Sequence, residues 1–211
     1  RGFRGSHVSF FLLPTLAWLL FFAVQPSAGQ TQQRPPAHAG SARNLQVFHA
    51  GEELVYEVSY LGIGLGSITT RITSVDTAKG AHRFATECLI RTYRGIPFVT
   101  LNTVFRSIMG DSLESVYFRN REFLADDSSF KIIEYNFPKN RNRVHIRERT
   151  DKHPDWAKDT TLSLEGKRWQ DGLSLFFFAR AFSHTSQIRH VPVLMYLTKA
   201  TTEIRFGVER E

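Results

Sequence analysis

The sequence predicts a mainly β protein, built as an antiparallel barrel-like or curved sheet with one buried helix. Short segments in which apolar and polar residues alternate recur along the chain, and no helical pattern separates most of them. A single continuous apolar segment near the end interrupts the series. Strands that follow one another without long crossovers pair in antiparallel fashion, so a sandwich or a barrel is the expected architecture.

The first strand is predicted over residues 53–60, where Tyr56 and Tyr60 lie in the row that alternation directs into a core. The glycine-rich segment 62–66 is expected to form a bend or bulge before the next strand. Residues 76–81 are expected to form a turn. The same alternation predicts the following strands at 67–75, 82–93, 99–107, 115–123, 130–137 and 143–150.

The apolar segment 171–182 predicts a helix with Asp171 as its N-cap. Its apolar residues are almost continuous over about three turns, so this helix must be covered on several faces by the sheet. A buried strand is the alternative, because periodicity does not separate the two in so short a segment. Two more strands are expected at 190–197 and 201–209, with Pro192 indicating an edge position or a strand start.

The start of the chain predicts export. Arg1 and Arg4 precede the apolar run 8–24, and small residues follow it, which is typical of a cleaved secretory signal peptide over residues 1–29. An uncleaved membrane anchor is the alternative, but the run is shorter than the roughly 20 apolar residues of a spanning helix. Residues 30–44 are then a flexible linker, and residues 45–211 a β-rich domain that is truncated at its C-terminus.

The chain of 211 residues has a formal net charge of +7, which makes acidic surfaces possible partners without the concentrated basic stripe of a nucleic-acid binder. We therefore expect no nucleic acid as a partner. Arg143, Arg147 and Arg149 share one face of a predicted strand and are candidates for contact with an anionic surface, such as lipid phosphates. The alternative is a solvated face that discourages pairing at the edge of the sheet.

Two groups of residues carry a family resemblance. They are Gly51, Glu52, Tyr56, Tyr60, Gly62 and Gly66 near the start, and Gln170, Asp171, Leu173, Ser174, Phe177 and Arg180 near the end. Over about residues 48–211 this pattern resembles the exported bacterial family known as domain of unknown function 3108. Gly172 stands where that family more often has Pro, and its final strands are missing here. The resemblance implies a β-rich protein of the Gram-negative periplasm and supplies no catalytic residues.

Aromatic residues in the inward rows and in the helix indicate an apolar ligand, such as an envelope lipid. The candidate ligand-binding residues are Tyr56, Tyr60, Phe176 and Phe177. This is an analogy with envelope carriers of acyl chains at the level of architecture. The alternatives are a filled interior with a structural role and a periplasmic protein-protein interaction module.

The sequence gives little support for catalysis or for a cofactor. The segment Gly110 to Leu113 matches the GDSL tetrapeptide of a serine-hydrolase family, but no D-x-x-H follows, so Ser112 is expected in a β-turn. Hydrolysis at Ser112 is kept as an alternative function. The chain contains neither an H-E-x-x-H nor an H-x-H motif, which would indicate a metal site. Cys88 alternates with apolar residues and is expected to be a small buried hydrophobe.

Overall fold

A computed structural model describes residues 47–78, 81–97, 100–123, 129–138, 142–183 and 188–205. All of them belong to one compact unit of the chain, Gln32–Glu211. The predicted signal peptide, the whole of the predicted linker and the end of the last predicted strand lie outside the described residues.

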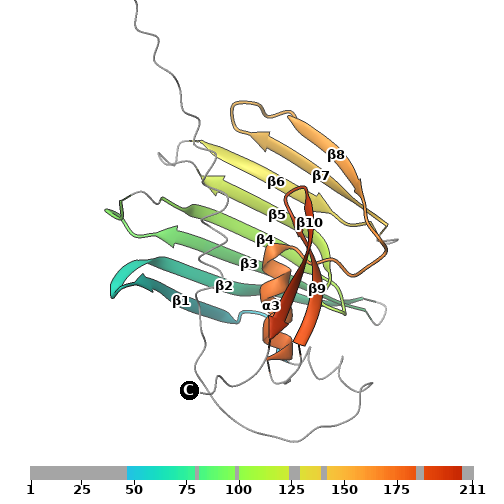
Figure 1. Ribbon diagram of the computed structural model, residues 1–211, viewed down its shortest axis with the longest axis horizontal. Coiled ribbons are helices and arrows are strands. Elements are labelled where there is room, and N and C mark those ends of the chain that lie inside the picture. The colour runs from blue at the N-terminus through green and yellow to red at the C-terminus, as the bar shows by residue number, and fades with distance from the viewer. Residues whose placement is uncertain are drawn as a thin grey trace, which may run out of the picture. The chain divides into compact units, whose positions relative to one another are not determined.

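Eight antiparallel strands form one curved sheet in which every strand pairs with its neighbours in sequence (Figure 1). The sheet is not closed, because β1 and β8 are its two edges. The fold class predicted from alternation is confirmed as a curved sheet. The strands are β1 (Glu53–Tyr60), β2 (Ile63–Ala78), β3 (Ala81–Thr92), β4 (Asn102–Met109), β5 (Ser115–Phe123), β6 (Phe130–Asn136), β7 (Arg143–Thr150) and β8 (Lys158–Ser163).

One helix and a two-stranded hairpin complete the described fold. Helix α3 (Gly172–Phe182) crosses the strands of the large sheet and contacts β3 and β4 (Figure 1). Strands β9 (Ile188–Met195) and β10 (Thr198–Arg205) pair with each other in a second sheet. We call the face of the large sheet that α3 contacts the inner face, and the opposite one the outer face. The predicted helix is therefore confirmed and lies against the sheet.

The strands depart from the sequence-based expectation in two places. Strand β8 was not expected, and the predicted strand 190–197 is interrupted by a turn at Tyr196, where β9 and β10 separate. The predicted bulge near 62–66 is present, because β1 pairs Val58 with Gly66 and Ser59 with Gly64, which leaves Leu65 of β2 as the extra residue. Gly66 lies inside β2, where a Cβ atom would be 2.2 Å from the carbonyl oxygen of Arg91, so a side chain has no room there.

The core lies between the inner face and α3. Phe48 contributes from the segment before β1, its ring making edge contacts with Phe84 at 5.4 Å and with Phe177 at 5.8 Å. Such aromatic pairs stabilise a core beyond the area they bury. The largest fully buried side chains include those of Phe84, Phe177, Ile72, Met109, Ile146, Leu173 and Leu194.

Candidate functional site

The N-terminus of α3 is fixed to the sheet by a fully buried carboxylate. Asp171 Oδ1 accepts hydrogen bonds from the backbone N–H groups of Leu173 and Ser174, each at 2.8 Å. Its Oδ2 accepts from the hydroxyls of Ser107 at 2.7 Å and Ser115 at 2.5 Å. Burial raises the pKa of Asp171, even though these hydrogen bonds act in the opposite direction. The predicted N-cap is confirmed, and it also anchors α3 to β4 and β5.

The other end of α3 is fixed to the start of β1. Arg180 forms an ion pair with Glu52, and its guanidinium lies over the ring of Phe48, 5.7 Å from the centroid. Just before the helix, Gln170 makes backbone hydrogen bonds of 2.9 and 2.8 Å with β9. Several residues that carry the family resemblance therefore hold α3 and the hairpin in place, which is a structural role.

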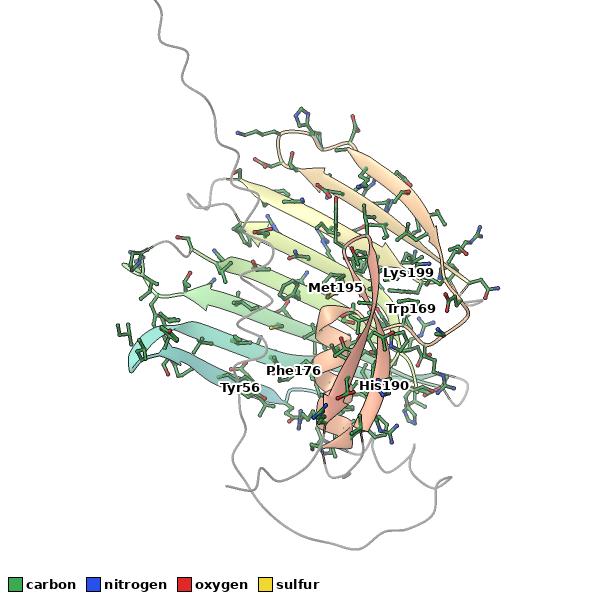
Figure 2. All side chains as sticks on the ribbon, viewed as in Figure 1. Tyr56, Trp169, Phe176, His190, Met195 and Lys199 are labelled. Carbon is green, nitrogen blue, oxygen red and sulfur yellow. The ribbon has the colours of Figure 1, made fainter. Side chains whose placement is uncertain are left out.

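Tyr56 and Phe176 meet where the edge strand β1 passes α3, and Figure 2 labels both. Their rings make an edge-to-face contact with centroids 5.6 Å apart, and both side chains are half-buried. We call this pair the aromatic seam. Phe177, in contrast, is buried and packs on Phe48. Of the predicted ligand-binding residues, Tyr56 and Phe176 thus lie together at a partly accessible margin, and Phe177 lies in the core.

Tyr60 lies apart from the other predicted ligand-binding residues. The bulge leaves the alternation of β1 intact, because its extra residue, Leu65, belongs to β2. Tyr60 is 67% exposed at the end of the strand, so it does not belong to a buried inward row. Alternation predicts the face on which the Tyr60 side chain lies, but not that the end of β1 is left uncovered.

The middle of the inner face combines apolar side chains with unpaired polar atoms. The strand register sets Thr70, Cys88, Phe105 and Asn120 side by side on β2 to β5, and we call these four residues the central row. Thr70 Oγ1 and Asn120 Oδ1 are buried, and neither has a hydrogen-bond partner in the described part of the chain. Neighbouring strands lie about 4.8 Å apart, so about 14 Å separates the strands of Thr70 and Asn120. Buried polar atoms are nearly always paired with a protein group or an ordered water, so these two atoms are candidates for hydrogen bonds to water or to a bound molecule.

Cys88 lies fully buried within the central row. Burial, with a smaller contribution from the charge of Glu87, raises the pKa of its thiol to about 12. Such a thiol is protonated at neutral pH and is a poor nucleophile. The prediction that Cys88 is a small buried hydrophobe is confirmed.

The turn of the β9–β10 hairpin reaches a charged cluster on the large sheet. The Tyr196 hydroxyl donates a hydrogen bond of 2.6 Å to Glu148 and accepts one of 3.4 Å from Lys158. Lys131 forms an ion pair of 2.9 Å with the same carboxylate. Burial opposes ionisation of Glu148, but the hydrogen bonds from Tyr196 and Lys131 and the charges of Lys131 and Lys158 lower its pKa. Sequence reasoning missed this cluster, because local patterns do not show where a hairpin docks.

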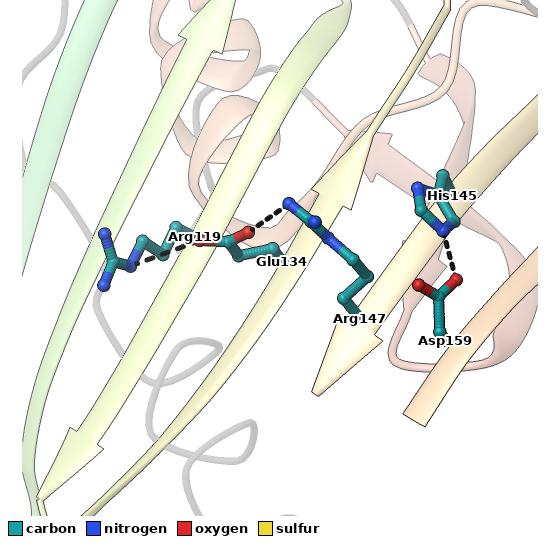
Figure 3. Close-up of polar contacts among 5 residues, drawn as sticks. All are labelled: Arg119, Glu134, His145, Arg147 and Asp159. Atoms are coloured by element: carbon teal, nitrogen blue, oxygen red, sulfur yellow. Dashed lines mark hydrogen bonds and ion pairs between the residues drawn. The ribbon is translucent and has the colours of Figure 1, made fainter. Parts of the chain in front are cut away.

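The predicted anionic-contact residues lie on the outer face. Figure 3 shows the carboxylate of Glu134 between Arg119 and Arg147, at 3.6 and 3.0 Å. The ring of Trp156 packs on the guanidinium groups of Arg147 and Arg149, with centroid distances of 4.3 and 5.2 Å. Arg147 and Arg149 are therefore half-buried and engaged in contacts within the protein.

Arg143 differs from the other two predicted arginines because it is exposed. Its neighbour in the row, His145, pairs with Asp159 (Figure 3). Among these arginines, Arg143 is thus the most accessible to an anion. It lines a hollow of about 290 Å³ together with Asn136, Pro138, His145 and Thr161.

Ser112 lies in the turn between β4 and β5, as predicted from its flanking residues. The N–H of Leu113 donates to the carbonyl oxygen of Gly110 at 2.9 Å, and Leu113 has a φ of 61°. The N–H of Ser112 donates to the carboxylate of Glu114 at 3.0 Å. A Cβ at Gly110 would lie 2.6 Å from that carboxylate, so the Glu114 side chain would have to move if the glycine were replaced. The geometry of the turn accounts for the GDSL segment.

No family model, curated protein or solved structure matches the chain. The resemblance to domain of unknown function 3108 therefore stays a prediction, as do export and the periplasmic location. Among the described residues, no group of three or more His, Cys, Asp or Glu side chains is placed to hold a metal ion. In those same ranges, no helix has the length and apolar character needed to cross a membrane.

Proposed function

We propose that this chain is an exported, non-catalytic protein of the cell envelope that binds an apolar ligand, such as the acyl chain of a lipid, on the inner face of its sheet. The observation that carries the proposal is the pair of buried, unpaired polar atoms in the central row, Thr70 Oγ1 and Asn120 Oδ1. A ligand that occupies this face would supply their missing partners.

Aromatic side chains surround the central row and support the proposal of an apolar ligand. Phe105 stacks on Phe118 with centroids 5.8 Å apart, and Phe118 packs on Tyr135 at 5.0 Å. Ligand pockets are mostly lined by such apolar and aromatic side chains and contain a few polar groups that fix the orientation. Phe105 and Asn120 are the half-buried members of the row and are the proposed points of contact with a hydrocarbon chain.

The two unpaired atoms differ in what they would recognise. The Thr70 hydroxyl donates or accepts, so it suits an ester or carboxyl oxygen, whereas the Asn120 carbonyl oxygen accepts from a hydroxyl or amide donor. A lipid with both kinds of group would be bound in a fixed direction along the row. The aromatic seam lies beside the open edge of β1, where no further strand of the described sheet pairs, and is the proposed point of entry.

A fluorescent acyl probe tests the proposal. We expect the full chain to bind a dansyl-labelled fatty acid, and Phe176→Ser to weaken that binding by roughly tenfold, since one large apolar contact is removed. Phe182→Ser is the matched control, because Phe182 lies on the same helix but packs on Phe178 and Arg189. Native mass spectrometry of chain purified without detergent should also detect a co-purified lipid.

Equal probe affinities for the wild-type chain and both variants would contradict the proposed site. A chain that binds no probe and carries no lipid would instead support the alternative of a periplasmic protein-protein interaction module. Labelling of Ser112 by a fluorophosphonate, lost in Ser112→Ala, would contradict the non-catalytic part of the proposal and favour hydrolysis.

A further inference from the structure

Four exposed apolar side chains gather at the tip of the β1–β2 hairpin. The exposed fractions are 67% for Tyr60, 84% for Leu61, 61% for Ile63 and 42% for Tyr93. Tyr93, which follows β3, lies on the opposite face of the hairpin from Tyr60 and Ile63, with its ring 3.5 Å from the position of a Cβ at Gly64. We call Tyr60, Leu61, Ile63 and Tyr93 the tip patch. Contiguous exposed apolar side chains mark interaction sites more often than scattered ones do.

Leu61 occupies a position that the fold itself does not favour for leucine. The turn has two residues between the paired positions Tyr60 and Ile63, and both are left-handed, with φ of 49° at Leu61 and 78° at Gly62. Two-residue turns of this kind prefer Asn or Asp followed by Gly, because a branched apolar residue is strained at positive φ. Leu61 does not lower the strain of the turn, and its side chain does not pack in the core. This combination indicates that the exposed side chain has a role of its own.

The charge beside the tip patch is positive. Arg91 and Arg94 are exposed on either side of Tyr93, and neither forms an ion pair with the described part of the chain. The nearby carboxylate of Glu57 accepts a hydrogen bond from the Tyr93 hydroxyl. Apolar and tyrosine side chains next to free arginines are the combination that suits an anionic membrane surface.

We propose that the hairpin tip docks on an anionic lipid bilayer, with Leu61 and Ile63 inserted among the acyl chains and Arg91 and Arg94 near the phosphates. This inference uses residues outside the inner face and therefore does not depend on the proposed ligand site. It assigns a membrane-contact role to Tyr60, at the interface between head groups and acyl chains, in place of the inward role expected from alternation.

A fluorophore on the tip itself tests the docking. We would replace Ile63 with Cys and attach NBD, whose emission rises and shifts to the blue in an apolar environment; Cys88 is fully buried and does not compete for the label. Vesicles of phosphatidylcholine mixed with phosphatidylglycerol should produce this change. The same label in the Thr201→Cys variant, on an exposed position of β10, should not respond. Because the readout is local, it reports the tip whichever other part of the chain contacts the lipid.

Leu61→Asn separates membrane docking from folding. The substitution creates the Asn-Gly sequence that the turn prefers, so the thermal midpoint should stay or rise while the apparent vesicle affinity of the labelled tip falls by roughly tenfold. Arg94→Gln should weaken binding to the mixed vesicles and leave the weaker response to pure phosphatidylcholine unchanged. Binding of the dansyl fatty acid should be the same in Leu61→Asn as in the wild-type chain, which distinguishes this proposal from the ligand site.

Three results would overturn the docking proposal. The first is a label at residue 63 that does not respond to vesicles, and the second is an unchanged vesicle affinity in Leu61→Asn. The third is a dimer of the wild-type chain, detected by light scattering without lipid and lost in Leu61→Asn, which would assign the tip patch to contact between two copies of the chain.

Discussion

Thr70 and Thr86 are both buried threonines on the inner face, but their hydroxyls have opposite surroundings. Thr70 Oγ1 has no partner in the described chain, whereas Thr86 Oγ1 donates a hydrogen bond of 3.2 Å to the carbonyl oxygen of Ser107. Thr70→Val should therefore raise the free energy of unfolding by about 1 kcal/mol, because it removes an unpaired polar group. Thr86→Val should lower it by about as much. Thermal and urea denaturation of the two variants measure this difference.

The same pair of variants connects stability with function. If the Thr70 hydroxyl binds the ligand, Thr70→Val should bind the dansyl fatty acid more weakly while being more stable. Changes of stability in the same direction for both threonine variants would contradict our account of the central row.

Asp171 shows which contacts of a single residue can be predicted from the sequence and which cannot. An aspartate directly before an apolar segment predicts a helix cap, and the hydrogen bonds to Leu173 and Ser174 are local enough to follow from that pattern. Its other two partners, Ser107 and Ser115, precede it by 64 and 56 residues, and no local signal places them. The unpaired atoms of the central row escape sequence reasoning for the same reason, since only the register of four strands sets them side by side.

At the scale of the elements, alternation predicts a strand wherever one face is buried. It misses β8, whose sequence KDTTLS contains a single large apolar residue, Leu162. The alternation pattern also extends the predicted strand beyond the end of β9 into the turn at Tyr196, because apolar residues lie on both sides of that position. Both failures occur where pairing with another strand, and not burial, defines the element.

The docking of the β9–β10 hairpin should depend on pH through Glu148. Its pKa is lowered in the folded chain, so the stabilisation is complete above the ordinary carboxyl pKa of about 4.3 and is lost as the pH falls through the folded value. Tyr196→Phe removes the hydrogen bond to Glu148 and should lower the free energy of unfolding by about 0.5 to 1 kcal/mol near neutral pH. This difference should shrink below about pH 4.

Urea denaturation across this pH range is the measurement. Tyr60→Phe is the matched control, because Tyr60 is exposed and makes no hydrogen bond in the described chain, so its substitution should have little effect at any pH. If Tyr196→Phe lowers the free energy of unfolding by the same amount at neutral and at acid pH, the hairpin is held by packing and not by the carboxylate.

At the scale of the whole molecule, the strands of the large sheet follow one another in space in the same order as in the sequence. Each strand from β1 to β8 pairs only with those adjacent in sequence, and the two edges do not meet. Sequence patterns predict such local pairing well, but they did not decide between a barrel and an open sheet, because closure depends on how far the accumulated curvature brings the edges together. Two elements make contacts between distant parts of the chain. Helix α3 is joined to β4 and β5 through its N-cap Asp171 and to the start of β1 through Arg180, and the β9–β10 hairpin reaches β7 through Tyr196.

This arrangement predicts that the Glu52–Arg180 ion pair holds the open edge of the sheet. Both side chains are largely buried, so Arg180→Met leaves the Glu52 carboxylate without its cation and should loosen the contact between β1 and α3. Hydrogen exchange followed by mass spectrometry should then be faster in β1 and in the last turns of α3, while β5 to β7 keep their protection, because those strands do not contact the pair. Arg106→Met is the control, since its ion pair with Glu87 joins two neighbouring strands at the exposed surface. If Arg180→Met accelerates exchange equally in all strands, the sheet and α3 unfold as one unit. If the substitution changes exchange in no strand, the packing of Phe48 and Phe177 holds the edge without the ion pair, and the ion pair is not needed to keep the aromatic seam together.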